Sequence, residues 1–140
     1  MIKIKKLSPE AISPKFMRDG DAAMDFYSNE NLTIQPDERK IISTGIAMAI
    51  PKGYVGLIWD RSGMAAKYGI KSMGGVIDPN YRGEVKIILH NLSKEDFNVE
   101  KGMRIAQMVI QAVENREILE VEELDDTTRG EEGFGSTGLR

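Results

Sequence analysis

The chain contains no cysteine and a single histidine, His90. Without cysteine the protein has no disulfide, no thiol nucleophile and no thiolate metal site, and one histidine cannot form a multi-histidine metal centre. We therefore interpret His90 as a structural or surface residue. A zinc-dependent cytidine deaminase is excluded, because that chemistry requires both cysteine and histidine ligands.

The sequence also lacks any apolar stretch of about 18 residues, the length that crosses a membrane, and its first residues lack the apolar segment of a signal peptide. Together with the absence of cysteine, this predicts a cytoplasmic protein without a membrane partner. There are 22 acidic and 19 basic residues, for a net charge of −3. A general nucleic-acid binder needs clustered positive charge to neutralise phosphates, so we expect no nucleic-acid partner. Cations that bind a phosphorylated ligand must then be grouped locally.

Apolar residues alternate with polar ones along much of the chain, which is typical of short β-strands. The alternation runs through residues 46–50, 55–59, 85–89 and 105–113. Turn-forming groups that contain proline, glycine and asparagine separate these stretches. The length of 140 residues suits one domain with one core. We predict an all-β fold, a jelly-roll-like β-barrel or sandwich, with one short helix.

The short helix is predicted over residues Ser62 to Tyr68, with Ser62 as a possible N-cap and Gly69 as the residue that ends it. Trp59 precedes the helix and shares its alternation with apolar residues, so we expect it in the core or in an interface. The stretch 104–113 is apolar on both faces and is predicted to be buried on both sides, with another subunit as one source of cover.

Residues 129–138 combine four glycines, one aromatic ring, two hydroxyl groups and one arginine. Glycine allows backbone N–H groups to turn toward an anion, and Arg129, Ser136 and Thr137 add side-chain donors. Phe134 could cover a flat ring such as a nucleobase. The segment is therefore a candidate phosphate grip, and a disordered glycine-rich tail is the alternative interpretation.

A second candidate phosphate site lies in residues 59–65. Arg61, Ser62 and Gly63 occupy the point where a predicted strand passes into the helix. Free N–H groups at the start of a helix, with an arginine and a hydroxyl beside them, can bind phosphate. A plain capped turn explains the sequence Asp60-Arg61-Ser62-Gly63 equally well.

Residues 74–85 are predicted to form a hairpin, because apolar residues flank a Pro-Asn turn. Its turn would present Asp78 and Tyr81 close together. A carboxylate in a phosphate site can act as a general base toward water, and a tyrosine ring can pack against a sugar. The alternative is a structural turn in which Asp78 accepts hydrogen bonds from nearby backbone.

Two single polar residues complete the candidates. Asp25 is a lone carboxylate between apolar neighbours, and it could bind Mg²⁺ through water, since Mg²⁺ takes few carboxylates when phosphates are also present. A structural role for Asp25 is equally open. Gln107 lies on an otherwise apolar face near Arg104, so its amide requires a partner that a ligand or a subunit could supply.

These segments resemble, in order, the five motifs of the trimeric dUTP pyrophosphatases. The matching stretches are residues 22–28, 61–65, 75–83, 102–107 and 129–138. The resemblance spans nearly the whole chain and implies a jelly-roll-like β homotrimer that hydrolyses dUTP to dUMP and pyrophosphate with Mg²⁺. It also implies that three chains share each active site.

The same resemblance implies a role for each matched residue. Asp78 would be the general base, Tyr81 the platform that excludes a 2′-hydroxyl, and Asp25 a ligand of Mg²⁺ through water. Backbone groups of the 75–83 segment would select uracil. The substrate-binding residues implied are Arg61, Ser62, Gly63, Gly75, Val76, Ile77, Tyr81, Gln107, Arg129, Phe134, Gly135, Ser136 and Thr137.

Residues 1–126 are predicted to form the β-barrel hydrolase domain, and residues 127–140 its flexible C-terminal lid. Glu132 departs from the usual glycine of the family pattern and adds negative charge to a lid that must close on a polyanion. A dCTP deaminase or a bifunctional deaminase is the nearest alternative on the same scaffold, although the deaminating glutamate arrangement has no counterpart here. A non-catalytic regulatory nucleotide-binding protein is another, and the presence of Asp78 argues against it.

Overall fold

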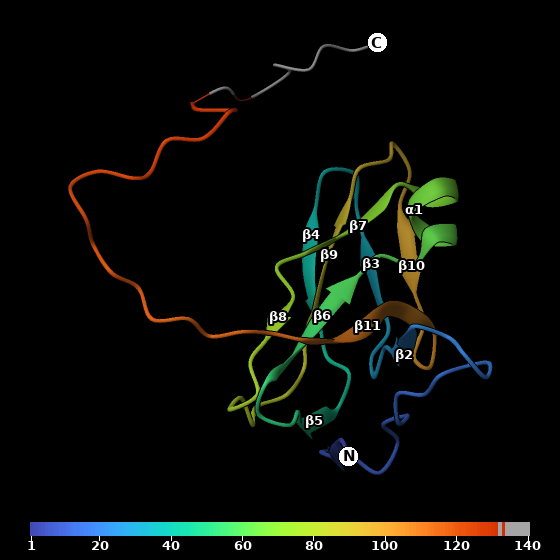
Figure 1. Cartoon of the computed structure of the whole chain (residues 1–140). Coiled ribbons are helices and arrows are strands. Elements are labelled where there is room, and N and C mark those ends of the chain that lie inside the picture. Colours follow the sequence, from blue (N-terminus) through green and yellow to red (C-terminus); the bar gives the residue numbers. More distant parts are fainter. Residues whose placement is uncertain (132, 134–140) are drawn as a thin grey trace.

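The computed structural model describes residues 1–131 and 133 of the chain (Figure 1). Eleven short strands and one helix make up this part, which confirms the predicted all-β class with a single short helix. The elements are β1 (Lys3–Lys6), β2 (Ala23–Tyr27), β3 (Leu32–Ile34), β4 (Arg39–Ile42), β5 (Ile46–Ala49), β6 (Tyr54–Trp59), α1 (Ser62–Tyr68), β7 (Ile70–Met73), β8 (Val76–Ile77), β9 (Ile87–Asn91), β10 (Phe97–Val99) and β11 (Arg104–Ala112).

All the strand pairs are antiparallel, and they form four small sheets within the described residues. The largest has the order β2-β11-β6-β8, and a second has the order β4-β9-β7. Both sheets contribute side chains to one core, including Phe26 and Met108 from the first and Ile42 and Leu89 from the second. Burial of such side chains contributes most of the stability of a fold of this kind.

The predicted hairpin over residues 74–85 is wrong. β8 pairs with β6, in the register Gly56 to Ile77 and Leu57 to Val76, instead of with the residues that follow the turn. On the other side of the turn, Glu84 forms an isolated bridge with Ala47. The two arms of the expected hairpin therefore have different neighbours, because each finds an open strand edge elsewhere in the barrel.

The helix has the predicted bounds, but its N-cap residue differs from the prediction. Arg61 is the N-cap residue, with an extended backbone and no capping bond from its side chain, and Ser62 is the first helical residue. Gly69 ends the helix in the left-handed conformation, with φ of 63°, as a C-terminal glycine is expected to do. Of the two positions predicted for Trp59, the core of its own chain is wrong, since 55% of its surface is exposed, and the interface stays a prediction.

The central strand β11 is buried over its first half only. Ile105, Ala106 and Met108 are inaccessible, whereas Gln111 and Ala112 are exposed. The predicted burial on both sides therefore holds near Arg104 and fails toward residue 113 in the single chain. The far end of the strand has no cover within the described part of the chain.

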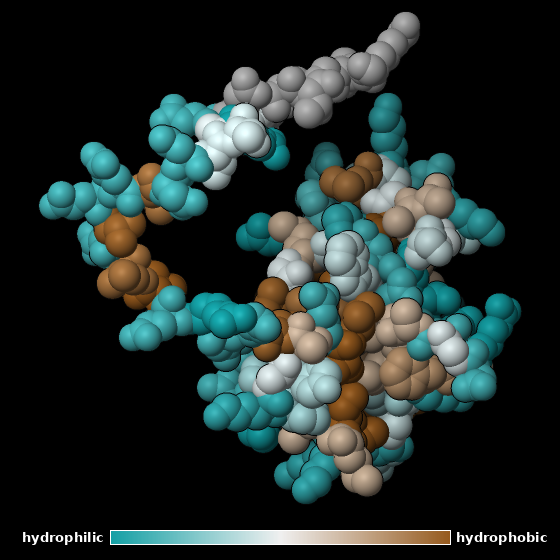
Figure 2. Space-filling model, in the orientation of Figure 1, coloured by the Kyte–Doolittle hydropathy of each residue, from teal (hydrophilic) through white to brown (hydrophobic). Residues whose placement is uncertain are grey.

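After β11 the chain runs away from the barrel as an extended segment (Figure 1). Residues 114–131 contain no strand or helix and are exposed throughout. Apolar side chains of this segment stand out among hydrophilic neighbours in Figure 2, and the exposed ones are Ile118, Leu119, Val121 and Leu124. Within the described residues, no helix is long and apolar enough to cross a membrane.

Candidate active site

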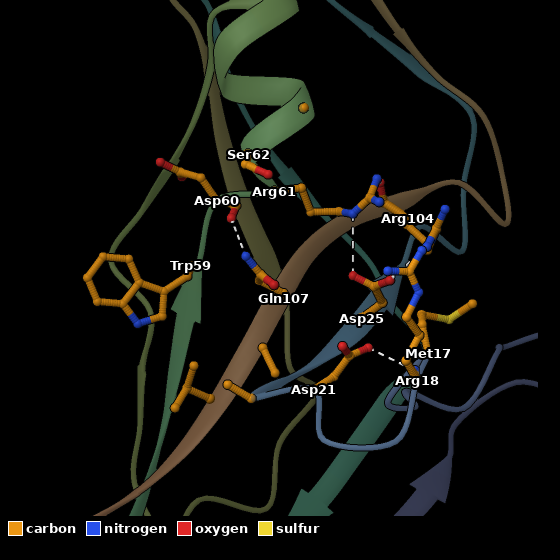
Figure 3. Close-up of a pocket in the computed structure, with 14 residues that line it drawn as sticks. Met17, Arg18, Asp21, Asp25, Trp59, Asp60, Arg61, Ser62, Arg104 and Gln107 are labelled. Carbon is orange, nitrogen blue, oxygen red and sulfur yellow. Dashed lines mark hydrogen bonds and ion pairs between the residues drawn. The ribbon is translucent and has the colours of Figure 1, made fainter.

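A large cleft of about 850 Å³ lies on the outer face of the sheet, next to the start of α1 (Figure 3). Its floor consists of side chains that lie opposite one another on three neighbouring strands. Gln107 of β11 is paired with Trp59 of β6 on one side and with Asp25 of β2 on the other. The next row carries Ala23 beside Val109. The sheet register therefore brings together residues that are 82 positions apart in the sequence, from 25 to 107.

A β-bulge in β11 places two of the polar side chains in the same cleft. Arg104 and Gln107 are three residues apart, and side chains at that spacing point to opposite faces of a regular strand. Between Arg104 and Ala106 the pairing with β2 shifts by one residue. The extra residue resets the alternation, so that both Arg104 and Gln107 line the cleft.

Asp25 lies between two arginines. Its carboxylate is almost buried, with 8% of the residue exposed, and it approaches Arg61 Nε at 3.3 Å and Arg104 Nη1 at 3.0 Å. Arg61 Nη1 also donates to the Arg104 carbonyl oxygen at 3.3 Å. Each guanidinium has five N–H donors, so two arginines that share one carboxylate keep donors for an anion in the cleft. The two guanidinium groups and the carboxylate together carry one net positive charge.

Asp60 joins the end of β6 to two other strands. Its carboxylate accepts hydrogen bonds from the Ser72 backbone at 2.6 Å and from Lys71 Nζ at 2.8 Å. Burial raises the pKa of Asp60, but the hydrogen bonds from Lys71 and Ser72 outweigh it, and the pKa is held below its usual value. Its carbonyl oxygen accepts Gln107 Nε2 at 2.7 Å. The amide NH₂ group of Gln107 therefore has a partner in its own chain, in addition to the ligand or subunit that the sequence leaves open for this residue.

The charges that line the cleft balance formally, since it has three arginines and three aspartates. Figure 3 shows that Asp60 directs its carboxylate away from the arginine pair, and this carboxylate forms an ion pair with Lys71. Asp21 accepts the backbone N–H of Arg18 at 2.8 Å. Of the three carboxylates, Asp25 is the one that contacts the guanidinium groups of Arg61 and Arg104. The cleft therefore offers arginine and backbone donors to an anion at the start of α1.

The predicted residues Asp78 and Tyr81 lie in a different cleft, of about 230 Å³, which Val76 and Ile77 also line. The backbone N–H of Tyr81 donates to the Asp78 carbonyl oxygen at 3.1 Å, so the predicted proximity of these residues is confirmed. Arg82 Nη1 donates to the carbonyl oxygens of Pro79 and Tyr81 and fastens the turn.

Gly75 positions the start of this second cleft. Its φ is +105°, and a Cβ atom built on it would lie 2.7 Å from the Ile58 Cβ atom. Both the backbone angle and the close approach therefore require glycine. In this arrangement Ile58 N–H donates to the Gly75 carbonyl oxygen at 2.9 Å, which holds the turn against β6.

Within one chain the structure thus divides the predicted site into two parts. Asp25, Arg61, Ser62, Gly63 and Gln107 line the large cleft, whereas Val76, Ile77, Asp78 and Tyr81 line the small one. β2 and β8 are the two outer strands of the same sheet, on opposite sides of β11 and β6. Arg129 belongs to the extended segment, and Glu132, Phe134, Gly135, Ser136 and Thr137 lie outside the described residues.

A family model described as dUTPase matches residues 9–138 of the chain. The chain belongs to the dUTPase family. The deoxyuridine 5'-triphosphate nucleotidohydrolase of Clostridium novyi (strain NT) is 50% identical over 138 residues and covers 97% of each chain. That of Nautilia profundicola is 50% identical over 139 residues and covers 98% of each chain. The predicted family resemblance is confirmed.

Solved dUTPase structures share the fold. A mutant dUTPase of Staphylococcus bacteriophage 80alpha with dUpNHpp matches with a TM-score of 0.94 at 32% identity, over 99% of each chain. A mutant dUTPase of phage phi11 of S. aureus, described for its coordination of a structural Mg(II) ion, matches with a TM-score of 0.84 at 28% identity. That match covers 90% of this chain and 99% of the phage chain. The likeness to dUTPase structures confirms the jelly-roll-like fold.

Sequence reasoning missed three contributors to the large cleft. Arg18 lines it from the loop before β2, and Trp59 lines it from the end of β6. Arg104 had been noted only as a nearby cation. The bulge that directs Arg104 into the cleft leaves no mark in the apolar alternation, because Ile105 and Ala106 are both apolar and both buried.

Proposed function

We propose that this chain hydrolyses dUTP to dUMP and pyrophosphate. The observation that carries the proposal is the arginine pair organised by Asp25 on the sheet floor, in a chain whose family match covers residues 9–138. Relatives at about half identity are named deoxyuridine 5'-triphosphate nucleotidohydrolase. A structural relative at 32% identity holds dUpNHpp, whose name describes a dUTP analogue with an NH group between phosphates.

The large cleft is the proposed phosphate site. Arg61 provides guanidinium donors, and Ser62 and Gly63 provide a hydroxyl and backbone N–H groups at the rim. Gln107 is oriented by its bond to Asp60, so it reaches the cleft in one fixed position. Such fixed donors stabilise the charge that develops on phosphate oxygens during phosphoryl transfer.

The small cleft is the proposed nucleoside site. Asp78 is the proposed general base: it accepts a proton from a water molecule whose oxygen attacks the α-phosphorus, while the bond to the β-phosphate oxygen breaks and pyrophosphate leaves. Tyr81, with 43% of its surface exposed, offers a ring face to the deoxyribose. Backbone groups of Gly75, Val76 and Ile77 are proposed to pair with the edge of uracil.

A complete site then needs more than one chain, because the phosphate and nucleoside parts lie in separate clefts of the same chain. We propose a homotrimer in which one subunit brings its 75–81 segment to the large cleft of its neighbour. The exposed apolar side chains of Val76 (67%) and Ile41 (63%) beside the small cleft support such packing. The C-terminal residues from Arg129 to Thr137 are proposed to complete the site as a lid from another subunit.

Mg²⁺ is the proposed cofactor, and the chain fits it as part of a metal–triphosphate complex. Across residues 1–131 and 133, no three acidic or histidine side chains are grouped to hold a metal by themselves. The carboxylate oxygens of Asp25 already face Arg61 and Arg104, which leaves a contact through water as its role toward the metal. When bound, Mg²⁺ would neutralise charge on the phosphate oxygens.

The activity is tested by incubating the purified protein with dUTP or dCTP and measuring pyrophosphate and ammonia. We expect pyrophosphate from dUTP and no ammonia from dCTP. Asp78→Asn keeps the shape and removes the base, so kcat should fall by about 10²- to 10⁴-fold. Ammonia release would instead identify a deaminase, and an Asp78→Asn variant with more than about a tenth of the activity would reject this base.

The shared site is tested by mixing two inactive chains. Arg61→Ala disables the phosphate part and Asp78→Asn disables the base, so each variant alone should be inactive. After co-expression, random assembly of the two chains should restore about a quarter of the wild-type activity, because a site is intact when two different subunits each supply the undamaged part. If one chain carried the whole site, the mixture would stay inactive.

A further inference from the structure

The ring of Tyr81 is held by the residues that directly follow it. Its hydroxyl donates to the Glu84 carbonyl oxygen at 2.9 Å. The ring lies over Gly83, where an added Cβ atom would be 2.4 Å from the tyrosine hydroxyl oxygen and 2.6 Å from Cζ. The requirement for glycine here is steric, because Gly83 is not among the described glycines with a positive φ. Any side chain at this position would displace the ring.

Glu84 in turn is anchored to another part of the barrel. Its carboxylate oxygen Oε1 accepts the Gly45 N–H at 2.8 Å and the Ser43 hydroxyl, and Lys86 Nζ approaches Oε2 at 3.8 Å. Burial raises the pKa of Glu84, but the hydrogen bonds from Ser43 and Gly45 outweigh it and lower the pKa. Its backbone bridges to Ala47 of β5. The acceptor of the tyrosine hydroxyl is therefore fixed both by side chain and by backbone.

We infer that Gly83 and Glu84 are positioning residues that hold the Tyr81 ring and thereby set the selection of deoxyribose over ribose. This inference rests on the proposed function of the small cleft. A ring excludes a 2′-hydroxyl only when it cannot move aside, so selectivity depends on what holds the ring. The tyrosine hydroxyl already donates its proton to the Glu84 carbonyl oxygen, so it has no proton left to donate to a ribose hydroxyl.

The test compares kcat/KM for dUTP, UTP and dCTP in the unmodified protein and in Glu84→Ala. Alanine keeps the carbonyl oxygen that accepts the Tyr81 hydroxyl but removes the carboxylate bonds to Ser43 and Gly45 that fix this carbonyl in place. The ratio of dUTP to UTP should therefore fall about five- to tenfold, while the ratio of dUTP to dCTP changes less than about twofold. The fraction of active protein cancels in these ratios, so a general loss of stability changes neither ratio. Glu84→Gln should keep the selectivity, because its amide oxygen can accept both hydrogen bonds.

Glu38→Ala is the matched control. Its carboxylate also accepts a backbone N–H, from Gln35 at 2.9 Å, and pairs with a lysine, Lys40, at 2.6 Å. It lies outside both clefts. Glu38→Ala should therefore leave the ratio of dUTP to UTP and the ratio of dUTP to dCTP unchanged.

Ser43→Ala removes the hydroxyl that donates to the Glu84 carboxylate, and it provides a second test if Glu84→Ala does not fold. This variant should also lower the ratio of dUTP to UTP. Gly83→Ala should lower kcat/KM for dUTP more than for UTP. In a Tyr81→Phe background, Glu84→Ala should cost little further selectivity, because the bond through which Glu84 acts is already absent.

The outcomes separate this inference from the proposed function. An unmodified protein that does not hydrolyse dUTP would overturn the proposed function and the inference with it. If the unmodified protein selects dUTP over UTP, and Tyr81→Ala abolishes that selection, the nucleoside site stands. An unchanged dUTP to UTP ratio in both Glu84→Ala and Ser43→Ala, or fully additive effects with Tyr81→Phe, would then overturn the inference alone.

Discussion

Replacing Asp25 by asparagine removes the charge that organises Arg61 and Arg104 while keeping the shape of the side chain. Arg61 and Arg104 contact different oxygens of Asp25, so the asparagine amide oxygen could accept from only one of them and the NH₂ group would face the other, which offers only donors. We expect at least one arginine to leave its present position. Since the two arginines lie on different elements, at the start of α1 and in β11, the change should affect both the stability of the fold and the geometry of the phosphate site.

The structure sets the size of the effect on stability. Removing one partner of a fully buried ion pair costs about 3–5 kcal/mol, and an exposed pair contributes about 0–1 kcal/mol. The side chains here are 12% exposed for Asp25, 28% for Arg61 and 40% for Arg104. An intermediate loss of about 2 kcal/mol follows, which for a chain of this length lowers Tm by about 5–8 °C.

The catalytic effect should be separable from the effect on binding. A displacement of about 1 Å in a positioning group can lower a rate by about 10²-fold, so kcat for dUTP should fall by about ten- to a hundredfold. KM should change less than kcat, because the loss of a negative charge favours binding of the anion whereas the displacement of an arginine opposes it. Thermal unfolding at a fixed chain concentration and initial rates with dUTP measure the two effects.

Asp21→Asn is the control, because it removes one negative charge from the same cleft without touching the arginine pair. If Asp25→Asn has the Tm and kcat of Asp21→Asn, the organising role of Asp25 is refuted. Recovery of the Asp25→Asn rate by excess Mg²⁺ alone would show instead that Asp25 acts mainly through the metal.

Three further predictions follow from other residues. Gly75→Ala should destabilise the fold by about 2–4 kcal/mol, from its positive φ and its contact with Ile58, and differential scanning calorimetry should show a lower Tm than for Gly63→Ala, where an added Cβ meets no atom within 4 Å. The lowered pKa of Asp60 gives stability that is present above its unfolded pKa, near 3.8, and lost as pH falls through the folded value. Asp60→Asn should therefore lower the free energy of unfolding at pH 7 and reduce the loss of this free energy as the pH falls, measured by denaturant titrations at several pH values. The same loss of stability at low pH in the variant and the unmodified protein would contradict this. Trp59 is the single tryptophan and lines the large cleft, so dUpNHpp with Mg²⁺ should change its fluorescence, and no change at saturation would place the ligand elsewhere.

The strands and the helix were largely predictable, because burial follows a period of two and the helix ends at a glycine. Ile46 and Leu89 are buried where the alternation places them. The N-cap of the helix was mispredicted because Ser62 suits this position chemically, whereas the chain enters the helix with Arg61 extended toward Asp25. For Trp59, alternation identifies a face of the sheet but not whether another layer of the same chain covers it, and its place in an interface stays a prediction.

The pairing of distant segments was the harder part. The local sequence around Asp78 indicates a hairpin, but strand partners are chosen among all open edges of the barrel, and β8 pairs with β6. The motifs predicted the residues of the site, and the distribution of these residues over two clefts could be read only from the structure. The roles of Phe134, Ser136 and Thr137 stay predictions, because these residues lie outside the described part of the chain.

The bulge in β11 has a consequence for how the length of this chain can change. A deletion of one residue between Arg104 and Gln107 would remove the bulge and leave these residues two positions apart, a spacing that keeps both side chains on one face of a regular strand. An insertion there would need a wider bulge to keep the register with β2. Alignments and engineered libraries should therefore read a one-residue gap between these two positions as compatible with the cleft, and substitutions at the buried Ile105 should keep its apolar character.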